Sequence, residues 1–354
     1  MVIIATDSFK GCLTSLQAGE AIAAGVAQAL TGEQVRVLNV SDGGEGILSA
    51  LVSATSAPIV EAPSHDALGR PITAEYALAA DGTAIIETAR IVGLPMLAPG
   101  ERNPLIATTR GVGEVIDHAA GRGSSRFIVG LGGSATSDCG MGMLRHLGLH
   151  YDGHTLDPSR LRHRRLEFTL AVDTRAPLLG DNGAARLYAP QKGASSEMVT
   201  RLEQRAEQFA AVSAAAMGYD RSMEPFAGAA GGLGYAFMQF YNASARSGAD
   251  LLLDSLDFDR LLRDATLVIT GEGHADRQTL TGKLPYAVLR RAKRCHVPVV
   301  LVAGAIDDSR QLLDAGFATV VNINPPSATI ASCLNPATAR RRLSLVGMRL
   351  GHRR

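Results

Sequence analysis

The chain has 354 residues, which is enough for about two domains and too long for a single small binding module. Its 35 basic and 34 acidic side chains give a net charge of +1, so no overall field would hold a nucleic acid or an anionic membrane. Glycine is in excess at 38 residues, whereas proline is ordinary at 15, so this excess does not indicate disorder. We expect a folded protein that acts on a small molecule.

The four cysteines and the N-terminal residues bear on the cellular compartment. The cysteines form no C-x-x-C pair and no cluster, which argues against a disulfide framework and against a zinc site. The first residues, MVIIATDSFK, lack the basic segment of a signal peptide, and no apolar run approaches the roughly 18 residues of a membrane span. A soluble, cytoplasmic protein is therefore expected.

Short β-branched runs alternate with apolar helical stretches, a pattern typical of an α/β protein whose strands are buried on both faces. The predicted strands are 2–5, 35–40, 84–86, 127–129, 168–172, 267–270, 297–303 and 319–323. Between the first two, Ser15 is expected to cap a helix over 16–30 that Gly32 ends. This order of strand, helix and strand predicts a βαβ unit at the start of a mostly parallel sheet.

Four of the predicted strands are followed by turns that combine glycine with an acidic residue. The turns are 7–11 (DSFKG), 41–46 (SDGGEG), 130–135 (GLGGSA, with an aspartate close behind) and 271–273 (GEG). Ligands of open α/β sheets bind at the carboxyl ends of the strands, where glycine lets backbone N–H groups approach an anion. Carboxylates at the same edge suit Mg²⁺ bound together with phosphate. A single such turn can also serve helix capping, but the four together predict a phosphate site.

Lysines supply the complementary positive charge. Lys10, Lys192 and Lys283 each stand next to glycine, where an ammonium group can reach a phosphate without steric crowding. A Walker A loop is absent, because Arg277 and Leu284 occupy positions where it needs glycine and Ser or Thr. The combination of lysines and acid-bearing turns favours a nucleoside triphosphate, Mg²⁺ and a small acceptor.

A dinucleotide site is the main alternative. Gly130-x-Gly132-x-x-Ala135 follows a predicted strand, and Asp152 lies about twenty residues further on, at the end of a short strand predicted over 148–151. An NAD(P)-dependent oxidoreductase of a small hydroxy acid would use this turn. It would leave the glycine turns at 43, 132, 193 and 271 without a shared task, whereas a nucleoside triphosphate, Mg²⁺ and an acceptor would use them all.

Seven segments, taken in order, resemble the motifs of the bacterial glycerate kinase family. They are 7–11 (DSFKG), 42–46 (DGGEG), 101–105 (ERNPL), 132–136 (GGSAT), 190–194 (PQKGA), 228–234 (GAAGGLG) and 270–283, which contains TGEG and QTLTGK. The match extends over essentially the whole chain. The resemblance implies transfer of the γ-phosphoryl group of ATP, with Mg²⁺, to D-glycerate, in most bacterial members at the 2-hydroxyl. It also implies two α/β domains with the active site in the cleft.

The resemblance implies that one domain is flavodoxin-like, with a doubly wound parallel sheet, and is built from both chain ends. We expect it at residues 1–60 and 266–354, with a smaller or inserted mixed α/β domain at 61–265, and residues 125–150 fit either domain. The expected partners are D-glycerate and ATP, with no nucleic acid and no membrane. A homodimer is left open.

The matching motifs also suggest roles for individual residues. The catalytic candidates are Asp7, Lys10, Asp42, Asp138 and Lys192. The candidates for substrate binding are Ser8, Arg102, Gly132, Gly133, Ser134 and Gln191. The candidates for nucleotide binding are Gly43, Gly44, Gly271, Gly273, Gln278, Thr279 and Lys283, and those for Mg²⁺ are Asp42, Glu45, Glu272 and Asp276.

Within these sets, the three lysines are expected to contact phosphate oxygens, and Arg102 could bind the glycerate carboxylate in a bidentate manner. Asp138 or Asp7 is the candidate for accepting the hydroxyl proton.

Several residues depart from the family pattern. They are Thr6, Ser137, Cys139, Ala176, His274, Ala275 and Arg277. The last three matter most, because a neutral imidazole in place of a guanidinium would weaken a phosphate contact, which Arg277 could restore from a neighbouring position. A catalytically inert, glycerate-binding relative of the family is therefore the third interpretation.

Overall fold

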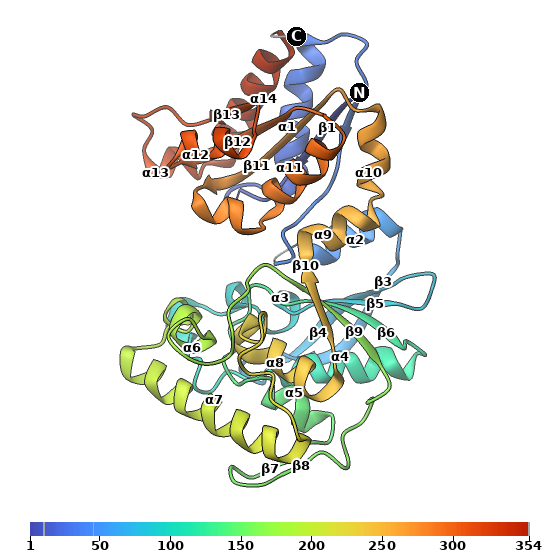
Figure 1. Cartoon of the computed structure of the whole chain (residues 1–354), viewed down its shortest axis with the longest axis vertical. Coiled ribbons are helices and arrows are strands. Elements are labelled where there is room, and N and C mark those ends of the chain that lie inside the picture. The colour runs from blue at the N-terminus through green and yellow to red at the C-terminus, as the bar shows by residue number, and fades with distance from the viewer. Residues whose placement is uncertain (10, 45, 353–354) are drawn as a thin grey trace. The chain divides into compact units, whose positions relative to one another are not determined.

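The computed structural model describes residues 1–9, 11–44 and 46–352, and the chain forms two compact units (Figure 1). Unit 1 comprises Met1–Asp42 and Ala249–Arg354, and unit 2 comprises Gly43–Gly248. Unit 2 is therefore inserted into unit 1, which is built from both ends of the chain. The boundaries expected from the sequence lie after residues 60 and 265, so residues 43–60 and 249–265 each belong to the other unit in the structure.

Among the described residues, the sheet of unit 1 has five parallel strands in the order β13-β12-β11-β1-β2. Their bounds are β1 Val2–Thr6, β2 Val35–Val37, β11 Leu267–Ala275, β12 Val299–Ile306 and β13 Thr319–Asn322. Numbered along unit 1 alone, this order is 2-1-3-4-5, which is the flavodoxin-like order. The predicted flavodoxin-like parallel sheet is confirmed.

Helices cover both faces of this sheet. Helices α1 (Ser15–Ala29) and α14 (Pro336–His352) share an apolar cluster with alternate strand residues such as Ile4 and Val302. Successive strand residues point to opposite faces, so the buried Ile3 faces the side that α11 (Leu284–Arg294) contacts. The other helical segments are α9 Gly248–Ser255, α10 Phe258–Leu261, η4 Leu262–Asp264, η5 Arg277–Thr281, α12 Ser309–Ala315 and α13 Ile330–Cys333.

Helices α1 and α14 pack with their backbones in contact, as Figure 1 shows for the blue and red helices that lie side by side. A Cβ atom on Gly25 would lie 1.9 Å from the carbonyl oxygen of Ser344, and one on Gly347 would lie 2.2 Å from that of Ile22. No side chain fits at either position, so glycine is required on both helices.

The start of α1 differs from the prediction. Thr14 is the N-cap residue: its Oγ1 accepts a hydrogen bond from the N–H of Gln17 (3.2 Å), and the Gln17 side chain accepts one from the N–H of Thr14 (3.2 Å). Ser15 Oγ instead donates to the carbonyl oxygen of Thr6 (2.7 Å) and accepts from the N–H of Val40 (3.1 Å). The predicted Ser15 cap is wrong, because this hydroxyl joins the chain segments that follow β1 and β2.

Unit 2 contains a mixed sheet whose strands, within the described residues, follow the order β10-β9-β6-β5-β4-β3. The first four run parallel, and β3 and β4 form an antiparallel hairpin. The bounds are β3 Ile59–His65, β4 Pro71–Leu78, β5 Ala84–Glu87, β6 Arg126–Gly130, β9 Glu167–Val172 and β10 Ser244–Ser247. A separate hairpin consists of β7 (His150–Tyr151) and β8 (Leu156–Asp157). The expected inserted mixed α/β unit is confirmed.

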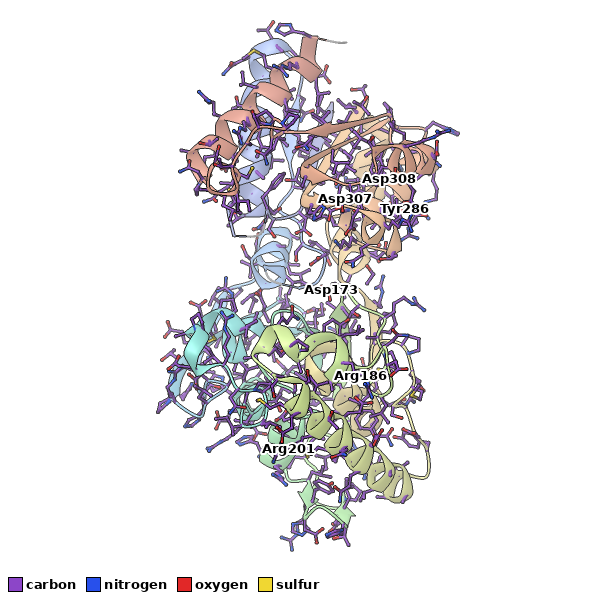
Figure 2. All side chains as sticks on the ribbon, turned by 90° about the vertical axis from the view of Figure 1, so that its left-hand side faces the viewer. Asp173, Arg186, Arg201, Tyr286, Asp307 and Asp308 are labelled. Carbon is purple, nitrogen blue, oxygen red and sulfur yellow. The ribbon has the colours of Figure 1, made fainter. Side chains whose placement is uncertain are left out.

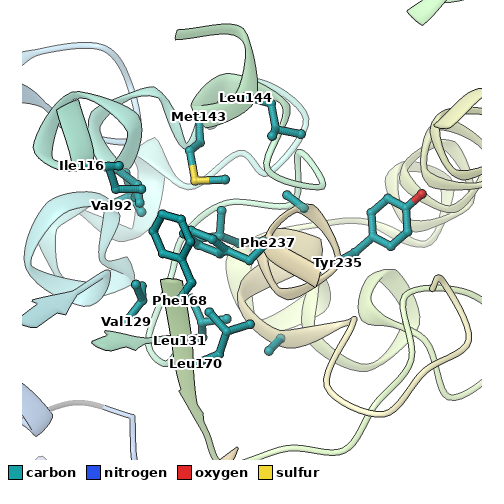
Figure 3. Packing of buried hydrophobic residues seen from close by; sticks show 14 of the residues in the cluster. Val92, Ile116, Val129, Leu131, Met143, Leu144, Phe168, Leu170, Tyr235 and Phe237 are labelled. Carbon is teal, nitrogen blue, oxygen red and sulfur yellow. The ribbon is translucent and has the colours of Figure 1, made fainter. Parts of the chain in front are cut away.

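The helices of unit 2 surround a large apolar cluster, part of which Figure 3 shows. The helices are α2 Ile47–Thr55, α3 Ala89–Val92, η1 Leu94–Met96, η2 Pro99–Glu101, α4 Arg110–Gly121, α5 Met141–His146, α6 Ala184–Tyr188, η3 Pro190–Lys192, α7 Ser196–Met217 and α8 Ala229–Tyr241. At the centre, the rings of Phe168 on β9 and Phe237 on α8 lie 4.9 Å apart, close to Met143 of α5. Residues of β6, β9, α5 and α8 therefore belong to one continuous apolar core.

All the predicted strands are present, with shifted ends. β11 runs on to Ala275, so the turn predicted at 271–273 is wrong and these residues continue the strand. β3 and β4 are additional strands that contain Pro63 and Pro71. β3 is the edge strand, and Pro71 is the first residue of β4, so both prolines occupy positions that a sheet tolerates. Among the helices described, none has both the length and the apolar character that crossing a membrane requires.

Candidate active site

Unit 1 holds a first group of predicted site residues, which we call the Glu272 cluster: Glu272, Thr279 and Lys283. Glu272 is only 6% exposed; its Oε1 accepts a hydrogen bond from the Thr279 hydroxyl (2.7 Å), and its Oε2 lies 3.4 Å from Lys283 Nζ. Burial raises the pKa of Glu272, although both partners act in the opposite direction. Such a carboxylate would be stabilised in its charged form by a further cation.

The short helix η5 brings Thr279 back to β11. Asp276 caps this helix: its Oδ1 accepts from the N–H of Gln278 (2.7 Å), and its own N–H donates to Thr279 Oγ1 (3.0 Å). The Thr279 hydroxyl therefore accepts one bond and donates the other to Glu272. Of the residues predicted here, Thr279 and Lys283 contact Glu272, whereas Asp276 and Gln278 form the helix cap.

The glycines of β11 permit close packing inside the sheet. A Cβ atom on Gly271 would lie 2.3 Å from the carbonyl oxygen of Val302, and one on Gly304 would lie 2.6 Å from that of Gly273. Both contacts join β11 to the neighbouring β12. Gly271 of β11 and Gly304 of β12 therefore have a packing role in the sheet that is independent of any nucleotide.

Two further buried carboxylates follow β1 and β2, the two strands on one side of β11. Asp7 follows β1; its N–H donates to the carbonyl oxygen of Gly271 (2.8 Å), and its Oδ1 accepts from the N–H of Ser8 (2.7 Å). Asp42 follows β2, on the other side of β1. The predicted Lys10 and Glu45 lie outside the described residues.

The acidic residues of unit 1 suit a cation that also has ligands from a substrate. In the described ranges, no three His, Cys, Asp or Glu residues gather closely enough to form a metal site on their own. Mg²⁺ usually takes only one or two protein carboxylates and fills its remaining positions with water and phosphate oxygens. The buried carboxylates of Asp42 and Glu272 fit that requirement, whereas the Asp276 carboxylate already serves as a helix cap.

The residues that depart from the family pattern lie at the end of β11. His274 Nε2 is 2.9 Å from Oδ1 of Asp307, which follows β12 and is labelled in Figure 2. Both side chains are more than half exposed, so the pair contributes little to stability. Ala275 is buried, and Arg277 is exposed at the start of η5. The imidazole at position 274 thus has an acidic partner of its own.

Unit 2 holds the second group, which we call the Lys192 cluster: Lys192, Ser134 and Thr136. Lys192 ends helix η3 and is only 3% exposed. Its Nζ donates to the carbonyl oxygen of Thr136 (2.6 Å) and to Ser134 Oγ (3.2 Å). Desolvation lowers the pKa of Lys192 to about 8, although the charge of Asp138 acts in the opposite direction. The predicted Lys192 and Ser134 are therefore brought together.

Glycines allow the neighbouring loops to approach the Lys192 cluster. A Cβ atom on Gly193, whose φ is +93°, would lie 2.6 Å from the carbonyl oxygen of Arg102. One on Gly231, at φ +67°, would lie 2.0 Å from the carbonyl oxygen of Thr136, which is the oxygen that Lys192 contacts. The motifs that contain these glycines meet in space because only glycine fits at the contacts.

Three buried polar atoms have no hydrogen-bond partner among the described residues: one belongs to the Lys192 cluster, one to the residue that follows it, and one to a residue whose backbone packs against Gly193. They are Arg102 Nε, Thr136 Oγ1 and Ser137 Oγ. Buried polar groups in native proteins are nearly always satisfied, so each unpaired group requires a ligand, a water molecule or another explanation. One guanidinium donor and two hydroxyl groups are the groups that would bind a small hydroxy acid.

Asp138 has a structural role. Its Oδ2 accepts hydrogen bonds from the N–H of Thr109 (2.9 Å), the Thr109 hydroxyl (3.0 Å) and the N–H of Gly142 (3.0 Å), and its Oδ1 accepts from the N–H of Gly140 (3.1 Å). Burial raises its pKa, and these donors counteract the rise. A carboxylate that already accepts four bonds is poorly placed to take a proton from a substrate.

Glycines 43, 44 and 132 mark crossings of the backbone in unit 2. A Cβ atom on Gly132 would lie 2.2 Å from the Cα of Gly44, and one on Gly43, at φ +103°, would lie 2.6 Å from the Cα of Gly248. Gly133, at φ +66°, is exposed. The glycine-rich turns at 43 and 132 therefore pack on each other. That their N–H groups bind an anion stays a prediction.

One buried carboxylate with a structural role is absent from the sequence predictions. Glu87 ends β5 and is buried; its Oε1 accepts from the N–H of Gly46 (2.9 Å) and its Oε2 from the N–H of Leu48 (3.0 Å). It therefore caps α2, whose N-cap residue Gly46 has no side chain to do so. The signal in the sequence is an acid directly after a predicted strand. The predicted Gln191 is exposed.

The dinucleotide alternative does not fit the geometry. After β6 and its glycine turn, the next helix, α5, begins only at Met141. Asp152 lies in the β7–β8 hairpin, outside the sheet that contains β6. A dinucleotide fold needs the helix directly after the turn and the acid at the end of a neighbouring parallel strand.

Known proteins resemble this chain over nearly its whole length. Residues 2–350 match the glycerate kinase family. The glycerate kinase of Bacillus subtilis (strain 168) is 40% identical over 95% of this chain and 93% of its own length. The glycerate 2-kinase of Escherichia coli (strain K12) is 36% identical, with 91% of each chain covered. A crystal structure of a candidate glycerate kinase 2 from Salmonella typhimurium LT2 has a TM-score of 0.82 and 34% identity, covering 99% of this chain and 96% of that one.

These matches extend through both units, and they define the class as phosphotransferases with an alcohol group as acceptor. The chain belongs to the glycerate kinase family. The resemblance seen in the seven sequence motifs is thereby confirmed, and the oxidoreductase alternative has no support from the relatives.

Proposed function

We propose that this protein transfers the γ-phosphoryl group of ATP to the 2-hydroxyl of D-glycerate, forming 2-phosphoglycerate and ADP with Mg²⁺. The observation that carries the proposal is the family match over residues 2–350. The name of the Escherichia coli relative, glycerate 2-kinase, favours the 2-hydroxyl. Because the reaction consumes ATP, we also propose a cytoplasmic location; a homodimer stays an open proposal.

We propose that unit 1 binds the nucleotide. Phosphoryl transfer requires the protein to position the triphosphate and neutralise its charge. Lys283, with its ammonium group near Glu272, and Lys10 would contact phosphate oxygens. Asp42 and Glu272 would hold Mg²⁺ directly or through water, and this ion would offset the charge of the phosphates. Glu45 and Asp276 are secondary candidates. The other proposed nucleotide contacts are Gly271, Gly273, Gln278 and Thr279 of the same unit, together with Gly43 and Gly44, the first residues of unit 2.

We propose that unit 2 supplies most of the contacts to D-glycerate. The unpaired Nε of Arg102 supports a role in binding the carboxylate, because a guanidinium group and a carboxylate can form two parallel hydrogen bonds. Gly132, Gly133, Ser134 and Gln191 would contribute further contacts, and Ser8 one from unit 1. Asp7 stays a candidate for the proton acceptor, whereas the four bonds to Asp138 argue against that residue.

A coupled assay of ADP release, with and without D-glycerate, tests the proposal. We expect ADP release that depends on both D-glycerate and Mg²⁺, and a ³¹P NMR spectrum of the product should show the phosphate on the 2-hydroxyl. Arg102→Lys should raise the KM for D-glycerate by about tenfold or more, because a lysine cannot replace the two parallel bonds. A folded protein that binds D-glycerate but releases no ADP would instead support the inert relative.

A further inference from the structure

The hydrogen bonds of Lys192 match those of a neutral amine. A protonated lysine has three N–H donors, whereas the neutral form has two donors and a lone pair. Among the described residues, Lys192 Nζ has two acceptors, the carbonyl oxygen of Thr136 and the hydroxyl of Ser134, and neither carries a charge. The neutral amine would use both of its donors on them and retain its lone pair.

The surroundings of Lys192 also favour the neutral form. The side chain is almost completely buried, and the energetic cost of burying an ammonium group is the main reason that its pKa falls to about 8. Asp138, whose charge raises the pKa of Lys192, already accepts four hydrogen bonds. Arg102 packs its backbone against Gly193, the residue that follows Lys192.

We propose that Lys192, as the neutral amine, accepts the proton of the glycerate hydroxyl during phosphoryl transfer. This inference rests on the proposed function. The O–H bond of the acceptor breaks and its proton passes to Nζ, forming the ammonium group. An O–P bond forms to the γ-phosphorus, the bond from that phosphorus to the bridging oxygen breaks, and ADP leaves. Solvent then takes the proton from Nζ and restores the amine.

Ser134 and Thr136 act as positioning residues in this step. By accepting both N–H groups, they direct the lone pair of the amine away from the loop. The carbonyl oxygen of Thr136 is held in turn by the close contact with Gly231, which no side chain could replace. A base that is oriented in this way before the substrate binds contributes about 10²- to 10⁴-fold in rate.

The sign of the pH dependence distinguishes this role from a contact between an ammonium group and phosphate. If Lys192 is the base, kcat/KM rises with pH and levels off above about 8, where the amine is neutral. If the ammonium group is what the reaction needs, kcat/KM falls through the same pH range, and the inference is overturned.

Lys192→Arg is the decisive variant, because arginine keeps a donor and a positive charge but cannot act as a base at these pH values. We expect kcat to fall about 10²- to 10⁴-fold and the rise with pH near 8 to disappear. Lys192→Met, which removes the buried charge, should lose as much activity while keeping or raising Tm. An arginine variant with more than a tenth of the wild-type kcat would disprove the role as base.

Lys192→Ala leaves room for a small amine added to the assay. We expect methylamine and ethylamine to restore part of the activity, and more basic amines of similar size to restore more. Restoration that is equal for amines of different basicity would contradict proton transfer. If the wild-type enzyme itself releases no ADP with D-glycerate, the proposed function fails; if only the variants behave otherwise, this inference alone fails.

Discussion

Two lysines that stand next to glycine in the sequence have opposite environments in the two units. Lys283 of unit 1 is 28% exposed, and its Nζ lies 3.4 Å from the carboxylate of Glu272, an acidic partner. Lys192 of unit 2 is buried, and its amine has only neutral acceptors among the described residues. The same local sequence pattern therefore supports two kinds of chemistry, and the partners decide which one. The variants below disturb each cluster in turn.

The largest effect is expected from Gly231→Ala, which acts on the support of the Lys192 cluster. The new Cβ atom would lie 2.0 Å from the Thr136 carbonyl oxygen, at a φ of +67° that disfavours any side chain. We expect unit 2 to lose about 3 kcal/mol or more of unfolding free energy, measured by urea denaturation. Gly82→Ala is the matched control: φ is also positive (+82°), but no described atom lies within 4 Å, so it should cost only about 1 kcal/mol. Equal losses would contradict the packing argument.

Asp138→Ala separates a structural role from a catalytic one in the same unit. It removes the acceptor of four hydrogen bonds and leaves buried donors unpaired, which should cost about 2–3 kcal/mol. At a temperature where the variant is folded, kcat should fall by less than about tenfold, because Lys192 keeps its own partners. A kcat reduced by several orders of magnitude in the folded variant would restore Asp138 as the base.

In unit 1, Thr279→Val tests how far Glu272 depends on its neutral partner. The variant removes the hydroxyl that donates to Glu272 and accepts from the N–H of Asp276. We expect a loss of about 1–3 kcal/mol in unfolding free energy. Thr281→Val is the control, because that hydroxyl is exposed and donates only to the carbonyl oxygen of Gln278; its effect should lie within about 0.5 kcal/mol.

The smallest effect on stability is expected from Lys283→Met. The ion pair with Glu272 is partly exposed and long at 3.4 Å, so its loss should cost less than about 1 kcal/mol. The KM for ATP should rise about tenfold if Lys283 contacts phosphate, whereas the KM for D-glycerate should stay within about twofold. An unchanged KM for ATP together with a raised KM for D-glycerate in this variant would contradict the assignment of Lys283 to the nucleotide.

Much of the fold could be predicted from the sequence, because its central strands are short apolar runs. The runs at 2–5 and 299–303 are buried on both faces, and this composition is what parallel strands require. The hairpin of β3 and β4 escaped prediction because it lies at the edge of the sheet, contains proline, and alternates buried residues with less buried or exposed ones. The extension of β11 was hidden by Gly271 and Gly273, which usually indicate a turn.

The candidate site was predictable as a set of residues but not as a set of contacts. The positions of Lys192 and Lys283 next to glycine drew attention to them, and their resemblance to family motifs strengthened the prediction. Their partners come from distant parts of the chain: Thr136 lies far from Lys192 in sequence, and Glu87 caps a helix that begins forty residues earlier. Such long-range hydrogen bonds decide the protonation and the role of each group, and a sequence pattern contains no direct signal for them.

The backbone contact between α1 and α14 has a consequence for the order in which the chain folds during its synthesis. Gly25 packs against α14, so helix α1 emerges from the ribosome long before the surface it needs has been made. Residues 43–248 form a continuous unit with its own core, and domains generally fold as units while translation proceeds. The inserted unit can therefore be fully folded before helix α14 is synthesised, at a time when the first forty residues still lack their packing partner.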